Sequence, residues 1–412
     1  MINAEKKNNF NLIRYAVLTV MYTVAYNSYF RSISVLWYGI SLLSIFMLAA
    51  SVLVKKDVKM NFFVYWAVIF YIFTVLSTLW SINPAKCMSP IMTLSLLFVV
   101  GVLMSLLFDS REELNALLFI NFLSLLFCAL YILLAVDPQS VGEVRIGLST
   151  VGSEWNANDI GLKMCVGLGI ALYLFYRSDK AYKRVFYLAV SLLFIILALL
   201  TGSRKALLMI YGIVILFVLI KSRGLNRVFA ILFILLFSAG LYFLVMNYEP
   251  LYNVLGERFE DMIAGLFGGG TDEDSFNIRA RFIEYGLKWF GNKPLLGYGI
   301  GNFSELAAAQ FGEKYDTYAH NNFVEILVDG GIVGFFIYYS AYLYIIVKLL
   351  PSVFIKRDLT AILLFTLNLV SLVLQVALVS YSSTLFTALI LFSVIYIKSI
   401  GREKRNEWKD IS

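Results

Sequence analysis

Long apolar runs, separated by polar connections, make up most of this chain. A helix needs roughly 20 apolar residues to cross a bilayer core about 30 Å thick, and most of the runs approach this length. The runs that predict membrane-spanning helices are Leu12–Tyr26, Ile33–Val54, Phe62–Trp80, Ile91–Phe108, Leu114–Val136, Ile160–Tyr176, Val185–Leu200, Ala206–Ile220, Val228–Met246, Ile332–Leu349, Leu359–Val379 and Leu385–Ile397. The pattern therefore indicates an all-α, polytopic membrane protein of about twelve transmembrane helices.

Positively charged residues set the expected orientation of these helices. Most of the 34 lysines and arginines fall in alternate connections and in the C-terminal segment GREKRNEWKD. Basic residues accumulate on the cytoplasmic side of membrane proteins. We therefore expect both termini in the cytoplasm, and an even number of spans agrees with this arrangement.

One long hydrophilic interruption, Asn247–Asn321, is external in this topology, and acidic residues outnumber basic ones in it. Loops of this length inside compact proteins are usually functional. Within the interruption we predict short helices near Ile278–Phe290 and Phe303–Phe311. The expected parts of the chain are an N-terminal transmembrane bundle (1–246), a large external loop (247–331), and C-terminal transmembrane helices with a cytoplasmic tail (332–412).

Composition excludes several other kinds of protein and site. Hydrophobic residues make up 60% of the chain and charged residues 15%, against roughly a half and a quarter in soluble domains. The topology accounts for the net charge of +7, so we expect no nucleic-acid partner. Cys87, Cys128 and Cys165 lack the spacing of a disulfide framework or a zinc site. Because Asp272–Asp274 also lacks the spacing of a calcium loop, we expect no metal ion and no cofactor.

The stretch Tyr318–Gly334, YAHNNFVEILVDGGIVG, sets titratable side chains against a run that is apolar enough for a membrane. It holds the only histidine of the chain, His320, followed by Asn321 and Asn322. A neutral imidazole can take the proton of a reacting hydroxyl, and Asp316 would orient the ring if the helix extended back that far. The alternative is an interfacial histidine at a helix start. The glycine pair later in the stretch predicts a bend.

Three arginines are candidates for binding an anion. Arg204 begins an apolar helix directly after a tight turn, which places its guanidinium at the outer membrane face. A guanidinium offers phosphate oxygens a fixed fork of donors; the alternative is an arginine that snorkels to the interface. Arg279 and Arg281 lie in a predicted helix of the long loop, where residues two apart face different sides. Only one of these two is expected to face any given site.

Two further segments are candidates for contact with a ligand. The segment from Arg145 to Asp159 is rich in small residues, amides and acids and holds one tryptophan, which suits the recognition of sugar hydroxyls. The alternative is an ordinary turn in which Asn158 or Asp159 caps the next helix.

The run PLLGYGIGNF from Pro294 resembles a dinucleotide loop only superficially, because no strand precedes it. We expect it to turn tightly near a ligand or a membrane surface.

The order of these features resembles the bacterial O-antigen ligase/polymerase superfamily. The specific matching covers roughly residues 145–334, and the flanking spans match only in hydropathy. The residues that carry the resemblance are the Ser203-Arg204 turn between two spans, Arg279 upstream of Pro294, the PLLGYGIGNF run, His320-Asn321-Asn322 opening a helix that ends at Gly330-Gly331, and the mid-chain segment Asn156–Asp159.

The resemblance implies a GT-C-like membrane glycosyltransferase at the outer face of the cytoplasmic (inner) membrane, with residues 247–331 as its catalytic loop. The donor would be an undecaprenyl-diphosphate-linked oligosaccharide, and the reaction would need neither a nucleotide sugar nor a metal ion. By position, Arg204 and Arg279 would hold the diphosphate, with Arg281 as the alternative to Arg279, and His320 would be the general base. The residues expected to bind substrate are Arg281, Arg145, Trp155, Asn156, Asn158, Asp159, Asn321 and Asn322.

We favour a polymerase of polysaccharide repeat units, for O-antigen, capsule or exopolysaccharide. A ligase that transfers the glycan to lipid A core, a wall polymer or a protein is the alternative. The expected partners are the lipid-linked donor, a glycan acceptor, the lipid bilayer, and a flippase and chain-length regulator. A polysaccharide transporter is the non-enzyme alternative; it would need charged or broken helices at mid-span, whereas the notable charges here fall at the outer face.

Overall fold

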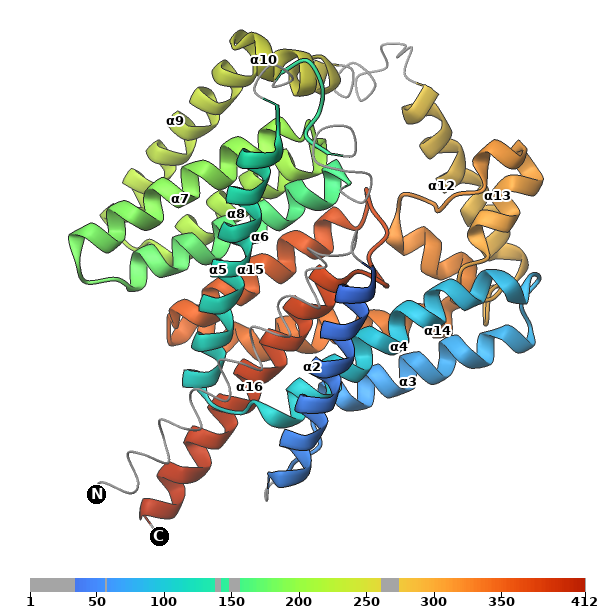
Figure 1. Ribbon diagram of the computed structural model, residues 1–412, viewed down its shortest axis with the longest axis horizontal. Helices are drawn as coiled ribbons and strands as arrows, with labels where there is room; N and C mark the ends of the chain where they lie inside the picture. The colour runs from blue at the N-terminus through green and yellow to red at the C-terminus, as the bar shows by residue number, and fades with distance from the viewer. Residues whose placement is uncertain (1–33, 56–57, 138–141, 148–155, 261–273, 412) are drawn as a thin grey trace. The chain divides into compact units, whose positions relative to one another are not determined.

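The computed structural model describes residues 34–55, 58–137, 142–147, 156–260 and 274–411 (Figure 1). Within this part of the chain the fold is helical, with no strand. Eight of the described helices are long and apolar enough to cross a membrane, and two shorter apolar helices, Gly39–Val54 and Leu359–Leu374, accompany them. The predicted all-α membrane fold is confirmed. The first predicted span, Leu12–Tyr26, lies outside the described residues, and each of the others coincides with a described helix.

Most helices match their predicted runs within about five residues, but α4 begins 7 residues before its run, α14 begins 10 residues before its run and α16 ends 14 residues after its run. The α-helices are α2 Ser34–Val54, α3 Phe62–Leu76, α4 Pro84–Leu107, α5 Arg111–Ala135, α6 Ala157–Arg177, α7 Ala181–Leu200, α8 Arg204–Lys221, α9 Leu225–Asn247, α10 Glu249–Leu251, α12 Asp274–Asn292, α13 Phe303–Phe311, α14 Asn322–Leu350, α15 Leu359–Leu374 and α16 Thr384–Ile411. Short 3₁₀ or π turns are η1 Ser77–Leu79, η3 Tyr252–Gly256, η4 Glu313–Tyr315 and η5 Pro351–Ile355.

The chain forms two compact units, each of which is described by itself. The first unit comprises Met1–Met47, Ser110–Ile263 and Leu349–Val370. The second unit comprises Leu48–Asp109, Ala264–Lys348 and Ser371–Ser412.

Helix α6 is the centre of the first unit, and every residue from Ile160 to Ala171 is buried. It packs against α5, α7 and α8. Small residues allow these close contacts, as is usual between helices in membranes. A Cβ atom at Gly161 would lie 2.8 Å from the Cβ atom of Ala206 on α8, and one at Gly167 would lie 2.8 Å from the Phe194 ring on α7.

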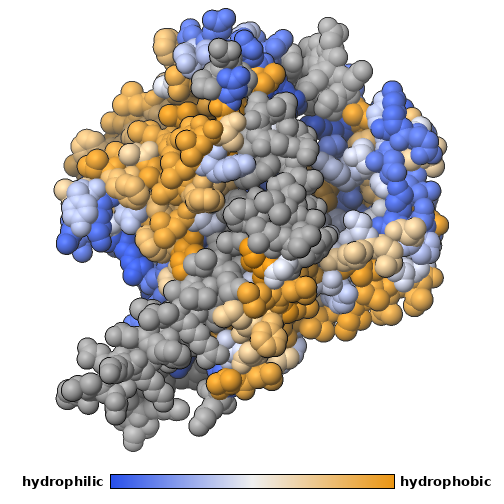
Figure 2. Space-filling view, in the orientation of Figure 1, coloured by the Kyte–Doolittle hydropathy of each residue, from blue (hydrophilic) through white to orange (hydrophobic). Residues whose placement is uncertain are grey.

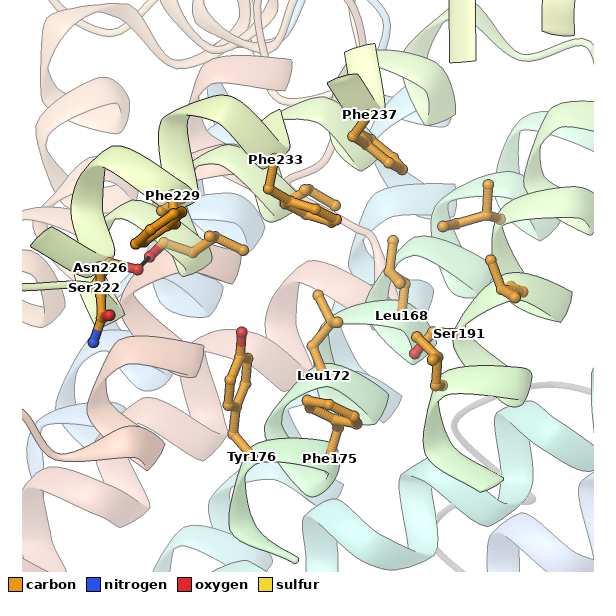
Figure 3. Close-up of a pocket in the computed structure, with 16 residues that line it drawn as sticks. Leu168, Leu172, Phe175, Tyr176, Ser191, Ser222, Asn226, Phe229, Phe233 and Phe237 are labelled. Atoms are coloured by element: carbon orange, nitrogen blue, oxygen red, sulfur yellow. Dashed lines mark hydrogen bonds between the residues drawn. The ribbon is translucent and has the colours of Figure 1, made fainter. Parts of the chain in front are cut away.

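Helix α9 packs much less tightly, and a groove of about 520 Å³ separates it from α6, α7 and α8 (Figure 3). Phe229, Phe233 and Phe237 of α9 line one side of the groove, and Leu168 and Leu172 of α6 line another. The lining is almost entirely apolar. In α9 only Ala230, Leu241 and Val245 are buried, so the helix makes few close contacts with the rest of its unit.

The second unit combines a transmembrane bundle with a polar, extramembrane part. Helices α3 and α4 lie side by side and α16 packs against both (Figure 1). The Nε1 atom of Trp66 on α3 donates to the carbonyl oxygens of Ile337 (3.1 Å) and Tyr338 (3.2 Å) on α14. In Figure 2, hydrophobic side chains cover α3 and α4, whereas hydrophilic ones gather over α12 and α13.

The predicted helices of the long loop are confirmed as α12 and α13. A small hydrophobic core joins them to the start of α14. Its buried residues are Phe282, Tyr298, Phe303, Ala307, Ala319, Val324 and Val328.

The predicted bend at the glycine pair is also confirmed, because Gly331 has a φ of 62° inside α14. A Cβ atom at Gly331 would lie 2.3 Å from the carbonyl oxygen of Leu295. The loop after α12 therefore lies directly against the bend, where only glycine fits.

Candidate functional site

The turn between α7 and α8, Thr201-Gly202-Ser203, carries the candidate site of the first unit. Gly202 has a φ of 58°, and a Cβ atom there would lie 2.3 Å from the carbonyl oxygen of Val254. Ser203 caps α8, since its Oγ accepts from the backbone N–H of Ala206 at 3.3 Å. Glycine and serine thus let the chain reverse within three residues and begin α8 at Arg204.

Three arginines of the first unit converge on this turn. The Nε atom of Arg145 donates to the carbonyl oxygen of Thr201 at 2.7 Å. Arg258 donates through Nη1 to the carbonyl oxygen of Gly202 at 3.3 Å, and Arg204 donates through Nη1 to the carbonyl oxygen of Arg258 at 3.3 Å. We call Arg145, Arg204 and Arg258 the arginine cluster. Sequence reasoning had singled out Arg145 and Arg204 but missed Arg258, which no local motif marks.

The charges of the cluster act on one another. Burial, together with the positive charges of Arg258 and Arg204, lowers the pKa of Arg145 to about 10. Like charges held together in this way favour the binding of an anion, because the anion relieves their repulsion. Guanidinium groups present several donors in a fixed fork that matches phosphate oxygens.

The predicted sugar-binding segment lies beside the cluster in the same unit. The side chain of Asn156 caps α6 by accepting from the N–H of Asn158 at 2.8 Å, and Ser203 Oγ donates to Asn158 Oδ1 at 2.9 Å. Asp159 pairs with Lys163 at 2.7 Å. Trp155 lies outside the described residues. The segment does cap the next helix, but the capping residue is Asn156 and not Asn158 or Asp159, as the sequence had suggested. Asn158 instead connects the start of α6 to Ser203 in the arginine turn.

The second unit carries a candidate site of its own at Tyr318–Asn321, the segment before α14, which we call the histidine turn. His320 has a φ of 56°, a value that few residues other than glycine adopt. Its ring lies 4.3 Å from that of Tyr318, measured between centroids, and its Nδ1 atom is buried. The residue itself is partly exposed. An imidazole in this position is both oriented by the protein and accessible from one side.

Hydrogen bonds from α14 hold this backbone in place. Glu325 Oε2 accepts from the N–H of Ala319 at 2.5 Å, directly before His320. Asn321 Oδ1 accepts from the N–H groups of Phe323 (3.0 Å) and Val324 (3.2 Å), which makes it the cap of α14.

Asn322 is fully buried and its amide is used within the protein. Its Oδ1 atom accepts from the N–H groups of Ser380 (2.8 Å) and Tyr381 (3.1 Å). Its Nδ2 atom donates to the oxygens of Tyr339 and Gln375, both at 2.9 Å. The amide has no position left for a substrate, so this environment favours a structural role over the substrate-binding role expected from the sequence.

The two arginines of α12 point differently, as their spacing predicts. Arg281 is exposed, and its guanidinium lies 4.7 Å from the centre of the Phe311 ring. Arg279 is partly buried and lies within electrostatic range of Tyr318. Burial raises the pKa of Tyr318, and the positive charge of Arg279 opposes that shift. Of the two, Arg279 is therefore the one beside the histidine turn.

Asp316 does not orient the histidine ring. Helix α14 begins at Asn322, so Asp316 is not one helical turn from His320. Its carboxylate instead pairs with Lys86 at 2.5 Å, and hydrogen bonding to Lys86 is the main reason why the pKa of Asp316 is lowered. The hypothesis that this aspartate positions the imidazole is therefore wrong.

Asp329 joins the glycine-rich run to the histidine helix. Its two carboxylate oxygens accept from the N–H groups of Gly301 and Phe303, each at 2.7 Å. Gly297, Gly299 and Gly301 all have positive φ. The run turns tightly, as predicted, and what it approaches is the backbone of α14: a Cβ atom at Gly297 would lie 2.4 Å from the carbonyl oxygen of Val328.

Among the described residues, no group of three or more histidine, cysteine, aspartate or glutamate side chains is placed to hold a metal ion. Asp272 and Glu273 lie outside these residues.

The fold is that of a multi-pass membrane protein. The first unit has arginines gathered at one helix turn, and the second unit has a histidine held at the start of another helix. Residues 188–339 match the family model described as O-antigen ligase. This match includes Arg204, Arg258, Arg279 and His320, and it confirms the resemblance to the O-antigen ligase/polymerase superfamily over that part of the chain. No curated protein matches the sequence.

Proposed function

We propose that this protein transfers a glycan from an undecaprenyl-diphosphate carrier to a hydroxyl group of an acceptor glycan. The arginine cluster is the observation that carries this proposal. It gathers three guanidinium groups at one turn, an arrangement that suits the several oxygens of a diphosphate, and two of them lie in the segment that matches the O-antigen ligase family.

In this reaction the acceptor oxygen forms a bond to the anomeric carbon while the bond from that carbon to the diphosphate oxygen breaks. The departing diphosphate gains negative charge. Guanidinium groups fixed around it stabilise that charge in the transition state, with no metal ion required. Arg204, Arg145 and Arg258 take this role in our proposal, and Arg279 is a fourth candidate.

The acceptor hydroxyl is a weak nucleophile until its proton is removed. His320 is the proposed general base, and proton transfer of this kind contributes roughly 10²–10⁴-fold to a rate. Arg279, beside Tyr318 and the histidine turn, would keep the substrate's negative charge near the base. Direct displacement by this route inverts the configuration at the anomeric carbon.

A polymerase that extends lipid-linked repeat units is the activity we favour. A ligase is the second candidate, because the matching family is described as O-antigen ligase. In either case we place the protein in the cytoplasmic membrane, with both termini in the cytoplasm and the reaction at the outer face. A flippase that supplies the donor and a chain-length regulator are the proposed partners.

The test is extension of purified undecaprenyl-diphosphate-linked repeat units by the purified protein, with and without a chelator. Chains of several repeats, formed equally with chelator present, would support the polymerase. Transfer only when lipid A core, wall polymer or an acceptor protein is added would identify the ligase. Transport of the lipid-linked units across vesicle membranes, with no new glycosidic bond, would contradict both activities.

A further inference from the structure

A cationic pocket lies at the end of the first unit where α8 ends at Lys221 and α9 begins at Leu225. Its volume is about 370 Å³. The residues that line it are Leu219, Ile220, Arg227, Ile231, Phe354 and Arg357. Helix α8 has 18 residues, and at 1.5 Å per residue it is about 27 Å long. The pocket therefore lies at the opposite end of α8 from the arginine cluster and is distinct from it.

The positive charges of this pocket are not neutralised within the described part of the chain. Arg357 is held at a φ of 57°, and its Nη1 atom donates to the carbonyl oxygen of Ile220. Its Nε atom is buried and has no hydrogen-bond partner among the described residues. Burial lowers the pKa of Arg357, and so do the charges of Arg223 and Arg227. Among the described residues none of these three arginines forms an ion pair with a carboxylate.

The nearest carboxylate in the sequence is already engaged. Asp358 pairs with Arg111 at 2.5 Å, and its other oxygen accepts from the N–H of Ala361 at 3.0 Å at the start of α15. It therefore neutralises Arg111 and caps a helix. A buried donor without a partner beside two further cations is costly unless an anion completes the site.

The rest of the pocket is apolar. Leu219, Ile220, Ile231 and Phe354 form its walls, and Ile231 and Phe354 are half exposed. The other side of α9 borders the apolar groove of Figure 3. A ligand that fits must carry a negative group for the arginines and a hydrocarbon part for these walls. Basic pockets between transmembrane helices bind anionic lipid head groups for this reason.

We propose that this pocket binds an anionic phospholipid, whose phosphodiester group contacts Arg223, Arg227 and Arg357 and whose acyl chain lies against Ile231 and Phe354. The lipid ties η5 to the α8–α9 turn and holds the loosely packed α9 against the unit. The site does not depend on the proposed glycosyl transfer.

Native mass spectrometry of the full-length protein in detergent tests the proposal. Phosphatidylglycerol should remain bound at collision energies that remove phosphatidylcholine. The triple variant Arg223→Gln, Arg227→Gln, Arg357→Gln should bind phosphatidylglycerol about 10-fold more weakly. The matched control is Lys180→Gln, Lys183→Gln, Lys356→Gln, which removes the same charge from exposed positions and should keep wild-type binding.

Two outcomes of this titration would overturn the proposal. If the control variant lost as much phosphatidylglycerol affinity as the arginine variant, the overall positive charge at this end of the unit, and not the pocket, would attract the lipid. Saturation by inorganic phosphate at the same concentration as the lipid would mean a soluble-anion site.

A second measurement uses the wild-type protein and does not require the variant to fold. Phosphatidylglycerol with a photoreactive group near its head group is cross-linked to the protein in nanodiscs, and the labelled peptides are identified. Label on the α8–α9 turn and η5, removed by excess phosphatidylglycerol but not phosphatidylcholine, is the expected result. Label confined to other segments would refute the site.

Discussion

At the scale of single residues, His320 is unusual because its backbone and its ring are both constrained. The φ of 56° is stabilised from one side by the bond between Ala319 N–H and Glu325, and from the other by the Asn321 cap. Such a conformation costs about 1–3 kcal/mol and is found mainly where function requires it. The surrounding network therefore supports a chemical role for the imidazole over that of an interfacial histidine.

Replacing His320 with asparagine separates these roles, because asparagine tolerates the left-handed conformation but cannot act as a base. We expect the rate of transfer to fall by about 10²-fold or more while thermal stability in detergent stays close to wild type. Chain elongation by the purified variant measures the first and a melting curve the second. Near-normal product length from a stable His320→Asn protein would remove the general-base role.

Replacing arginines of the cluster with lysine tests whether the shape of the guanidinium group matters when the charge is kept. Lysine keeps the charge of arginine but loses its fork of donors. We expect Arg204→Lys and Arg258→Lys each to lower kcat/KM for the lipid-linked donor at least about tenfold, since a charged hydrogen bond contributes roughly 1.5–3 kcal/mol. Arg184→Lys, on an exposed position of α7, serves as the control. If Arg204→Lys and Arg258→Lys keep the same kcat/KM as the control Arg184→Lys, Arg204 is only an interfacial arginine.

At the scale of elements, the short α7–α8 turn determines whether the arginines meet. Gly202 and Gly224 both have positive φ, at 58° and 50°. They differ in their surroundings, because a Cβ atom at Gly202 would meet the Val254 carbonyl at 2.3 Å and one at Gly224 would meet nothing within 4 Å.

Alanine at both glycines therefore distinguishes backbone strain from a steric clash. Gly224, with a φ of 50° and a ψ of −134°, lies in a region that side chains rarely adopt, so Gly224→Ala should cost about 1–3 kcal/mol from backbone strain alone. Gly202→Ala should cost clearly more and also reduce donor binding. Melting temperatures and donor affinity of the two variants provide the comparison. Equal losses of stability, with donor binding kept, would mean that the turn has no part in the site.

In the second unit, Asp329 holds two segments of the chain together, as the α7–α8 turn does in the first unit. Both of its oxygens accept backbone hydrogen bonds, from Gly301 and Phe303, so the carboxylate connects the glycine-rich run to the helix that carries His320. In an asparagine, an NH₂ group would replace one of the two oxygens and face the N–H group that this oxygen accepts from. Neither this NH₂ group nor that N–H group would then have an acceptor.

We expect Asp329→Asn to destabilise the protein by about 1–3 kcal/mol and to lower activity through the displaced histidine turn. Asp316→Asn is the control: it removes the charge that pairs with Lys86 at an exposed position and weakens the hydrogen bond with Ser304, and exposed pairs contribute little. Thermal unfolding in detergent compares them. A larger loss from Asp316→Asn would contradict the role given to Asp329.

At the scale of the whole molecule, the arginine cluster and the lipid pocket face opposite sides of the membrane if α8 crosses it. The three cysteines are all buried, so newly introduced cysteines can report on each side. Glu143 lies two residues before Arg145, and Asp179 lies in the α6–α7 connection; both are exposed.

With a membrane-impermeant thiol reagent, Glu143→Cys should react in intact cells and Asp179→Cys only after permeabilisation. This result follows from the basic residues that gather at the Asp179 end of the helices. The opposite pattern would invert the topology and place the proposed reaction on the cytoplasmic side.

The sequence alone determined the class of protein, the positions of most helices within about five residues and the bend in α14; the additional turns at the start of α4 and α14 and at the end of α16 lie outside the apolar runs. These properties are local: a span must be apolar along its length because lipid satisfies no polar group, and a bend needs residues that tolerate it. The resemblance also depended on linear order, from Ser203-Arg204 to the glycines after His320, and the family match agrees with it.

Only the tertiary structure decided which side chains act together. Arg258, Arg145 and Arg204 come together from segments far apart in the chain. The side chain of Asn322 uses its donors and acceptor in hydrogen bonds that include residues after α15. Arg279 rather than Arg281 lies beside the histidine turn, and Asp316 pairs with Lys86 instead of His320. Such contacts depend on how helices pack and where each side chain points, and neither hydropathy nor spacing along the chain encodes them.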